Sequence, residues 1–75
     1  MTVHFRLLVR EALRSSGMSM QKLSHKAELD YKTVQRLVRD PRRNVDMETL
    51  ARVAYALGVD VSTLVRSETS EEPEK

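Results

Sequence analysis

The segment 20–39, MQKLSHKAELDYKTVQRLVR, contains two short amphipathic stretches that meet at residues 28–30. Ser19 precedes the first stretch and Asp30 precedes the second, and both residue types favour the N-cap of a helix. Pro41 ends the second stretch, because proline disfavours helical geometry in the residue before it. The sequence therefore predicts two consecutive short helices joined by a tight turn, which leaves few folds open to so short a chain.

Three further helical segments are predicted by apolar periodicity and by helix-ending residues. Segment 6–16 has apolar residues at three- and four-residue intervals, and Gly17 ends it. Segment 47–57 begins after Asp46 and ends at Gly58, and a last short turn covers 61–65, with Leu64 directed into the core and Asp60 as its cap. We therefore expect an all-α fold of five helical segments.

The two ends of the chain have patterns that differ from those of the helical segments. Residues 3–7 alternate apolar and polar side chains, which suits a strand, an extended arm or the first turn of the helix 6–16. An arm with exposed Val3 and Phe5 is one candidate surface for a second subunit. The last residues, 67–75 (SETSEEPEK), are polar and acidic, so we expect a domain over 1–66 followed by a disordered tail over 67–75.

Length and composition limit the class of protein. Seventy-five residues make one small domain, and the absence of cysteine excludes disulfides and thiolate metal sites. The first residues lack the apolar core of a signal peptide, and no apolar run approaches the roughly 20 residues that cross a membrane. These features predict a soluble, cytoplasmic protein with no membrane partner.

Positive charge is concentrated in the middle of the chain. The tail 67–75 has four glutamates and one lysine, so residues 1–66, with 12 basic and 7 acidic groups, carry a net charge of +5. A clustered basic face is typical of nucleic-acid binding, although charge alone fits a solvated helix surface better. Segment 22–43 contains three acidic residues and seven basic ones, namely Lys22, Lys26, Lys32, Arg36, Arg39, Arg42 and Arg43.

The segment 31–39 separates into two faces when it is wound as a helix. Val34, Leu37 and Val38 lie on one side, and long hydrogen-bonding side chains fill the other. Arginine and lysine donate to guanine and glutamine pairs with adenine in the major groove, where the N-terminal part of a helix-turn-helix recognition helix lies. The predicted base-reading residues are Tyr31, Lys32, Thr33, Gln35 and Arg36.

Phosphate contacts are expected on either side of this reading helix. Basic residues that follow the reading positions suit phosphates, and the free amides at the start of helix 20–27 can also hold one. An ordinary solvent-facing helix is the alternative, and the absence of acidic residues from 31–39 favours DNA. The predicted phosphate contacts are Ser19, Gln21, Arg39, Arg42 and Arg43.

Residues 6–66 resemble the Cro/repressor-type (XRE-like) helix-turn-helix domain. The resemblance is carried by GMSMQKLSHKA (17–27), DYKTVQRL (30–37) and METLARVAYALGVDVSTLV (47–65). It implies a compact five-helix, repressor-like domain that is usually dimeric, with its second and third helices on the DNA. The groove-facing positions of the family correspond to Tyr31, Lys32, Thr33 and Arg36 in this sequence.

The chain departs from the family pattern at three positions. Glu28 stands in the turn where the family has glycine, so the turn is either strained or built differently. Met20 replaces a glutamine that contacts a phosphate and braces the reading helix. Asp40 replaces a glycine or asparagine at the end of that helix, and aspartate tolerates left-handed geometry better than most residues.

These observations predict a bacterial or phage transcription regulator, and we expect a repressor rather than an enzyme. His4 and His25 are far apart without metal-ligand spacing, and neither a catalytic set nor a cofactor motif is present. Expected partners are duplex DNA, a second copy of the chain and, in an antitoxin-like version, a separately encoded protein. A protein-interaction module that kept the helical fold without DNA binding is the rival hypothesis. Besides the arm at residues 3–5, the end formed by Tyr55, Leu64 and Val65 is a candidate dimer surface.

Overall fold

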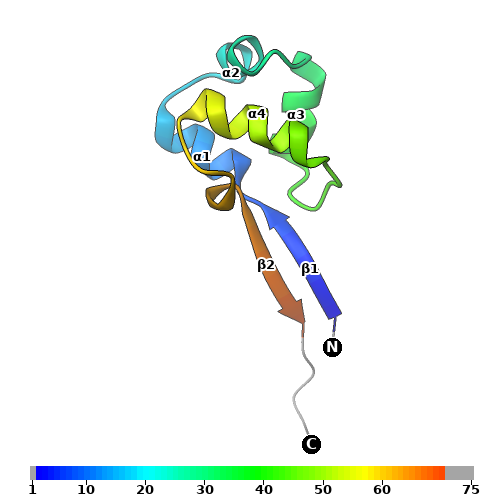
Figure 1. Ribbon diagram of the computed structural model, residues 1–75. Coiled ribbons are helices and arrows are strands. Elements are labelled where there is room, and N and C mark those ends of the chain that lie inside the picture. Colours follow the sequence, from blue (N-terminus) through cyan, green and yellow to red (C-terminus); the bar gives the residue numbers. More distant parts are fainter. Residues whose placement is uncertain (1, 71–75) are drawn as a thin grey trace, which may run out of the picture.

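A computed structural model describes residues 2–70 of the chain as a body of four α-helices with a two-stranded ribbon projecting from one end (Figure 1). The strands β1 (Thr2–Leu7) and β2 (Val65–Ser70) form the ribbon, and the helix α2 lies at the opposite end of the body. The remaining elements are α1 (Val9–Ser16), α2 (Met20–Ala27), α3 (Tyr31–Arg39), α4 (Met47–Leu57) and the 3-10 helix η1 (Val61–Thr63).

Local signals in the sequence place most helix ends correctly. The side chain of Ser19 accepts a hydrogen bond from the amide of Lys22, and that of Asp60 accepts one from the amide of Ser62. Gly17 and Gly58 end α1 and α4 in left-handed geometry, with φ of 73° and 72°. N-cap positions are also held by Asp30 and Asp46, but without a side-chain capping hydrogen bond.

The strand pair corrects the expected all-α fold of five helices. β1 and β2 run antiparallel, with Phe5 opposite Ser67 and Leu7 opposite Val65. Arg6, predicted to start the first helix, lies in β1, and α1 begins only at Val9. Residues 3–7 are thus a strand, because pairing with a segment at the other end of the chain satisfies backbone groups that a first helical turn would leave open.

The second strand also changes the description of the C-terminal end. β2 extends to Ser70, so residues 67–70 are ordered in a strand rather than disordered. The rest of the predicted tail, 71–75, lies outside the described residues. The predicted last turn over 61–65 is shorter than expected, because η1 ends at Thr63 and Val65 begins β2.

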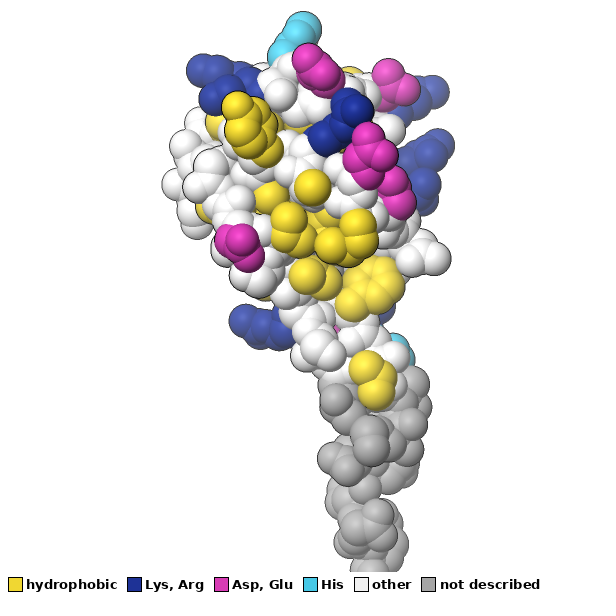
Figure 2. Space-filling view, in the orientation of Figure 1, with side chains coloured by type: hydrophobic (Ala, Val, Ile, Leu, Met, Phe, Trp, Pro, Cys, Tyr) yellow, Lys and Arg dark blue, Asp and Glu magenta, His cyan; other side chains and the backbone are white. Residues whose placement is uncertain are grey.

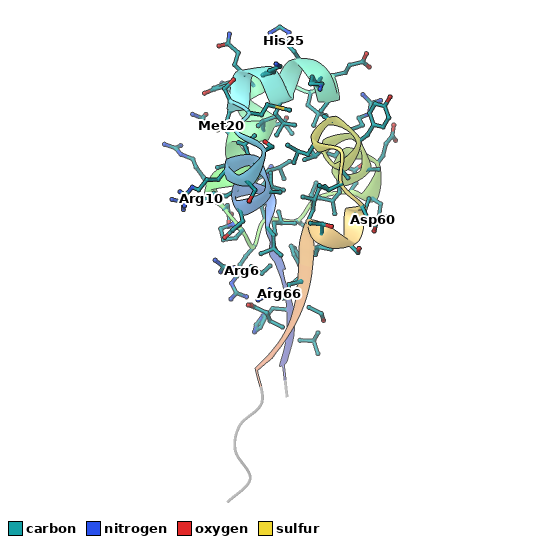
Figure 3. The ribbon with its side chains drawn as sticks, turned by 90° about the vertical axis from the view of Figure 1, so that its left-hand side faces the viewer. Arg6, Arg10, Met20, His25, Asp60 and Arg66 are labelled. Atoms are coloured by element: carbon teal, nitrogen blue, oxygen red, sulfur yellow. The ribbon has the colours of Figure 1, made fainter. Side chains whose placement is uncertain are left out.

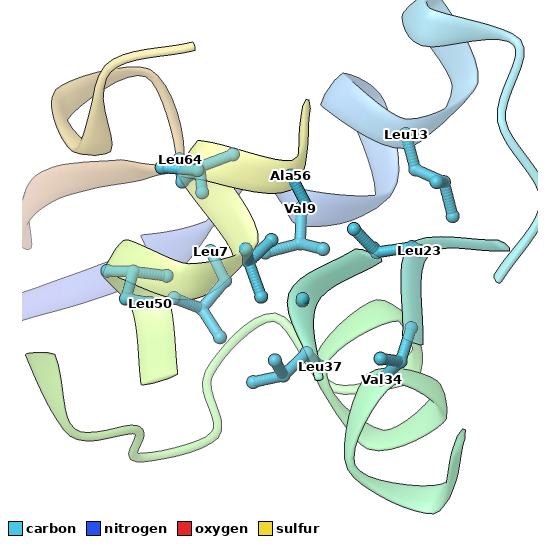
Figure 4. Close-up of a cluster of buried hydrophobic side chains, with 12 residues drawn as sticks. Leu7, Val9, Leu13, Leu23, Val34, Leu37, Leu50, Ala56 and Leu64 are labelled. Atoms are coloured by element: carbon cyan, nitrogen blue, oxygen red, sulfur yellow. The ribbon is translucent and has the colours of Figure 1, made fainter. Parts of the chain in front are cut away.

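The core lies between the four helices and the base of the ribbon (Figure 4). Burying a leucine or valine side chain contributes about 1.5–3 kcal/mol each, so this cluster is the main source of stability. One backbone hydrogen bond joins the ribbon to the body, from the Leu7 amide to the Pro41 carbonyl (2.6 Å), and just beyond the strands the Leu8 amide donates to the Leu64 carbonyl (2.7 Å). The buried residues are Leu7, Val9, Leu13, Leu23, Ala27, Val34, Leu37, Leu50, Val53, Ala54, Ala56 and Leu64.

Candidate nucleic-acid interface

The helix α3 presents one face to the core and the other to solvent, as its sequence pattern predicts. Val34 and Leu37 are buried, and Val38 packs partly buried against them. Tyr31 is 45% exposed, and Lys32 and Arg36 are exposed one helical turn apart. The outer face of α3 therefore offers long hydrogen-bonding side chains over successive turns, the arrangement that fits a major groove.

The basic side chains of this face are free to meet a ligand. Within residues 2–70, no ion pair involves Lys32, Arg36 or Arg39. The other two predicted base-reading residues, Thr33 and Gln35, are half-buried on the flanks of the helix. A row of cations that form no ion pairs suits an anionic polymer.

The turn between α2 and α3 is strained at Glu28. This residue has φ 57° and ψ 47°, the left-handed geometry that glycine adopts at low cost. The amide of Leu29 donates to the carbonyl of Ser24, five residues earlier, at 3.0 Å. The amide of Val59, which follows Gly58, makes the same kind of hydrogen bond to the carbonyl of Ala54. Of the two alternatives for this turn, the strained one is therefore correct, at a cost of about 1–2 kcal/mol.

Arg52 on α4 braces this strained turn, a contact that our sequence analysis did not identify. Its Nη1 lies 3.4 Å from the Glu28 carbonyl oxygen and 4.0 Å from Glu28 Oε1. Its Nη2 lies 3.3 Å from Oε2 of Glu48, one turn earlier on α4. The four-residue spacing of Glu48 and Arg52 was the available signal, but it predicts only the pair within the helix.

The N-terminus of α2 carries two of the predicted phosphate contacts. Ser19 and Gln21 are exposed, and the hydroxyl oxygen of Ser19 accepts the Lys22 amide at 3.1 Å while its proton remains free to donate. Met20 is half-buried against the core. The side chain that replaces the expected glutamine therefore contributes packing and cannot donate a hydrogen bond to a phosphate.

The loop after α3 carries the remaining cations. Arg39, at the end of the helix, and Arg43 are exposed, whereas Arg42 pairs with Glu68 of β2 at 3.1 Å between Nη2 and Oε1. Asp40, where helix α3 ends, has φ −117° and ψ 93°, which is extended backbone. The left-handed geometry expected at this position is not used, so aspartate carries no strain there.

Residues 2–70 also show which other kinds of site the fold offers. There, no group of three His, Cys, Asp or Glu side chains is arranged to hold a metal ion. His4 lies on β1 and His25 on α2, at opposite ends of the structure. No helix among residues 2–70 combines the length and apolar character needed to cross a membrane.

The fold and the exposed basic face of α3 together define a helix-turn-helix DNA-binding domain. Residues 9–70 match the family model of the Cro/C1-type HTH DNA-binding domain, and the chain belongs to this family. Among solved structures, it is similar to the clp gene regulator ClgR from C. glutamicum, at 31% sequence identity and a TM-score of 0.60, over 77% of this chain and 79% of that chain. No functionally curated protein matches the chain.

Proposed function

We propose that this DNA-binding regulator is a repressor that recognises a specific duplex sequence by placing α3 in the major groove. The observation that carries the proposal is the outer face of α3, where Lys32, Arg36 and Arg39 are free of ion pairs within residues 2–70. The similarity to a gene regulator supports a role in transcription. In this proposal, the protein represses by occupying a promoter.

The predicted contacts divide into two sets by their place on the domain. Arg36 is assigned to a guanine edge, since its guanidinium can donate to O6 and N7 together, and Gln35 to an adjacent base. Tyr31, Lys32 and Thr33 complete the base-reading set at the N-terminal part of α3. The phosphate-contacting set flanks it from α2 and from the loop after α3, and comprises Ser19, Gln21, Arg39, Arg42 and Arg43.

We further propose that the protein works as a homodimer on paired half-sites, because two copies of so small a domain multiply both contact area and specificity. A second candidate function is an interaction module for a separately encoded protein. The open concavity lined by Lys26, Glu28, Arg52 and Tyr55 favours it, since Tyr55 is 85% exposed beside a strained turn.

Selection from a random duplex library tests the proposal directly. The expected result is one enriched sequence with two-fold symmetry, bound with an affinity that falls as salt rises, with a slope near −0.9 per phosphate contact. Binding that is absent even at low salt would contradict DNA recognition and favour the interaction module. Equal binding to all duplexes would contradict base reading by α3.

A further inference from the structure

The β1–β2 ribbon has two chemically different faces. Successive residues of a strand point to opposite sides, so Val3, Phe5 and Leu7 share one face with Val65 of the paired strand. The other face carries charged and polar residues, namely His4, Arg6, Arg66 and Glu68, of which Arg6 and Arg66 are marked in Figure 3. One side of the ribbon therefore carries the apolar side chains of β1, beside Ser67 and Thr69 of β2, and the other side is charged and suited to water.

The apolar face is covered at its base and open toward its tip. Leu7 is 2% exposed, Phe5 is half-buried and Val3 is 65% exposed. Met47, at the start of α4, is 66% exposed and lines a shallow concavity with Phe5 and Val65. Figure 2 shows hydrophobic side chains gathered on the body above the ribbon, and a separate hydrophobic spot lower down on the ribbon. The helical body thus leaves part of the apolar side chains of β1 uncovered.

The outer edge of β1 offers backbone hydrogen bonds beside this surface. The Leu7 amide donates to Pro41, so it points away from β2. Because residues of an antiparallel strand alternate in direction, Val3 and Phe5 also direct their amides and carbonyls to this outer edge. Pro41 occupies the edge at Leu7, which leaves the stretch around His4 open. Open, apolar strand edges are templates for pairing with another strand.

We propose that a second copy of this chain covers this surface, with the two β1 strands paired antiparallel about a two-fold axis at His4. Val3 of one copy then lies opposite Phe5 of the other, which is a hydrogen-bonded pair because both direct their backbone groups outward. The four-stranded sheet that results has Val3, Phe5 and Leu7 of both copies on one face, beside Met47 of each copy. An isolated two-stranded ribbon is marginally stable, so the added strands also stabilise β1 and β2.

The charges along β1 favour this occupant and this register. With the axis at His4, Arg6 lies opposite position 2 of the other copy, so that no two arginines face each other. An axis at Phe5 would require the edge at Leu7 that Pro41 already occupies. The rival surface at the Tyr55 end is less suitable, because Leu64 is fully buried in the core. The pairing deepens the proposed homodimer but does not depend on DNA binding.

Sedimentation equilibrium without DNA tests the assembly. We expect the wild type to be a dimer, and Val3→Glu with Met47→Glu to raise the dissociation constant at least about 100-fold, because two carboxylates would be buried. Both side chains are largely exposed in one copy, so circular dichroism should show an intact fold. Tyr55→Glu, at an 85% exposed site on α4, is the matched control and should remain dimeric. A monomeric wild type at high micromolar concentration would overturn the proposal, as would dissociation by Tyr55→Glu instead.

Cross-linking tests the register even if the double variant fails to fold. The chain has no cysteine, so His4→Cys introduces a single thiol at the proposed axis. Residues opposite each other in a non-hydrogen-bonded antiparallel pair have Cα atoms about 4.5 Å apart, which a disulfide can span. Oxidation should give a covalent dimer with His4→Cys and little with Tyr55→Cys. Equal cross-linking of the two variants would overturn the paired-strand interface.

Because no DNA is present, these tests separate the interface from the proposed function. A ribbon-paired dimer that selects no DNA sequence would leave the inference standing and remove DNA recognition. A monomer that selects a sequence would do the reverse.

Discussion

Arg42, in the loop after α3, forms an ion pair with Glu68 of β2, with 3.1 Å between Nη2 and Oε1. The other arginines of the predicted interface, Arg36, Arg39 and Arg43, have no such partner within residues 2–70. The side chains are 51% and 33% exposed, so the pair contributes little to folding. In the proposed DNA contact, Glu68 therefore competes with a phosphate for the guanidinium of Arg42.

Removing the acid should strengthen DNA binding. We expect Glu68→Gln to raise affinity for every duplex about 1.4- to fivefold, which corresponds to the roughly 0.2–1 kcal/mol of an exposed ion pair. Arg42→Ala should weaken binding to all sequences alike and flatten the salt slope by about 1. Fluorescence anisotropy titrations at several salt concentrations measure both effects. If Glu68→Gln raises the affinity equally in the Arg42→Ala background, Glu68 weakens DNA binding through its negative charge and not through its ion pair with Arg42.

Base reading by Arg36 is tested by two substitutions. Arg36→Ala should cost roughly 1–3 kcal/mol on the selected site and relax preference at one base pair, because a bidentate guanine contact is lost. Arg36→Lys is the matched control, since it retains the charge but loses the planar fork, and it should keep non-specific affinity while losing discrimination. Competition titrations against single-base variants of the site measure this. An equal loss on all sequences after Arg36→Ala would identify a phosphate contact instead.

The strained turn between α2 and α3 should respond to glycine. Glu28→Gly relieves the cost of the left-handed backbone, and part of the gain is offset by the greater entropy of glycine in the unfolded chain. We expect the free energy of unfolding to rise by about 0.5–1 kcal/mol in urea titrations. Glu28→Gln keeps the strain and removes only an exposed ion pair with Arg52, so it should change stability by less than about 0.5 kcal/mol. Destabilisation by glycine would mean that the Glu28 side chain matters more than its backbone.

The cap of η1 predicts a pH dependence of stability. Hydrogen bonds from the Ser62 hydroxyl and amide lower the pKa of Asp60 below its ordinary value of 3.8. A carboxyl whose pKa is lower in the folded state stabilises the fold at pH values above its unfolded pKa. This contribution to stability is lost as the pH falls through the folded pKa. Asp60→Asn keeps an acceptor for the cap but cannot titrate, so its urea midpoint should fall less than that of the wild type between about pH 5 and about pH 3. Identical falls in the two proteins would exclude Asp60 as a contributor.

The reading helix was predictable because its determinants are close together in the chain. Asp30, Pro41 and the spacing of Val34 and Leu37 define the limits and the buried face of α3, and the structure reproduces both. Helical hydrogen bonds join residues four apart, so the pattern needs no distant partner. The same reason explains why Ser19 and Asp60 were correctly predicted as caps.

The long-range contacts made by the segments on either side of α3 were not predictable in the same way. Arg52 reaches the Glu28 carbonyl only because α4 packs beside the α2–α3 turn, and Arg42 meets Glu68 only because β2 returns past the loop after α3. Polar side chains of this kind carry no periodic signal, since their partners lie 24 and 26 residues away in sequence.

The sequence by itself determined the four α-helices, their apolar faces and the basic side chains of α3, because each depends on neighbours within one or two helical turns. Only the tertiary structure decided that residues 2–7 form a strand rather than a helical turn, and that residues 67–70 are ordered. A strand satisfies its backbone by pairing, and the partner of β1 lies at the other end of the chain. Its stability therefore depends on the folded body that brings Leu7 and Val65 together.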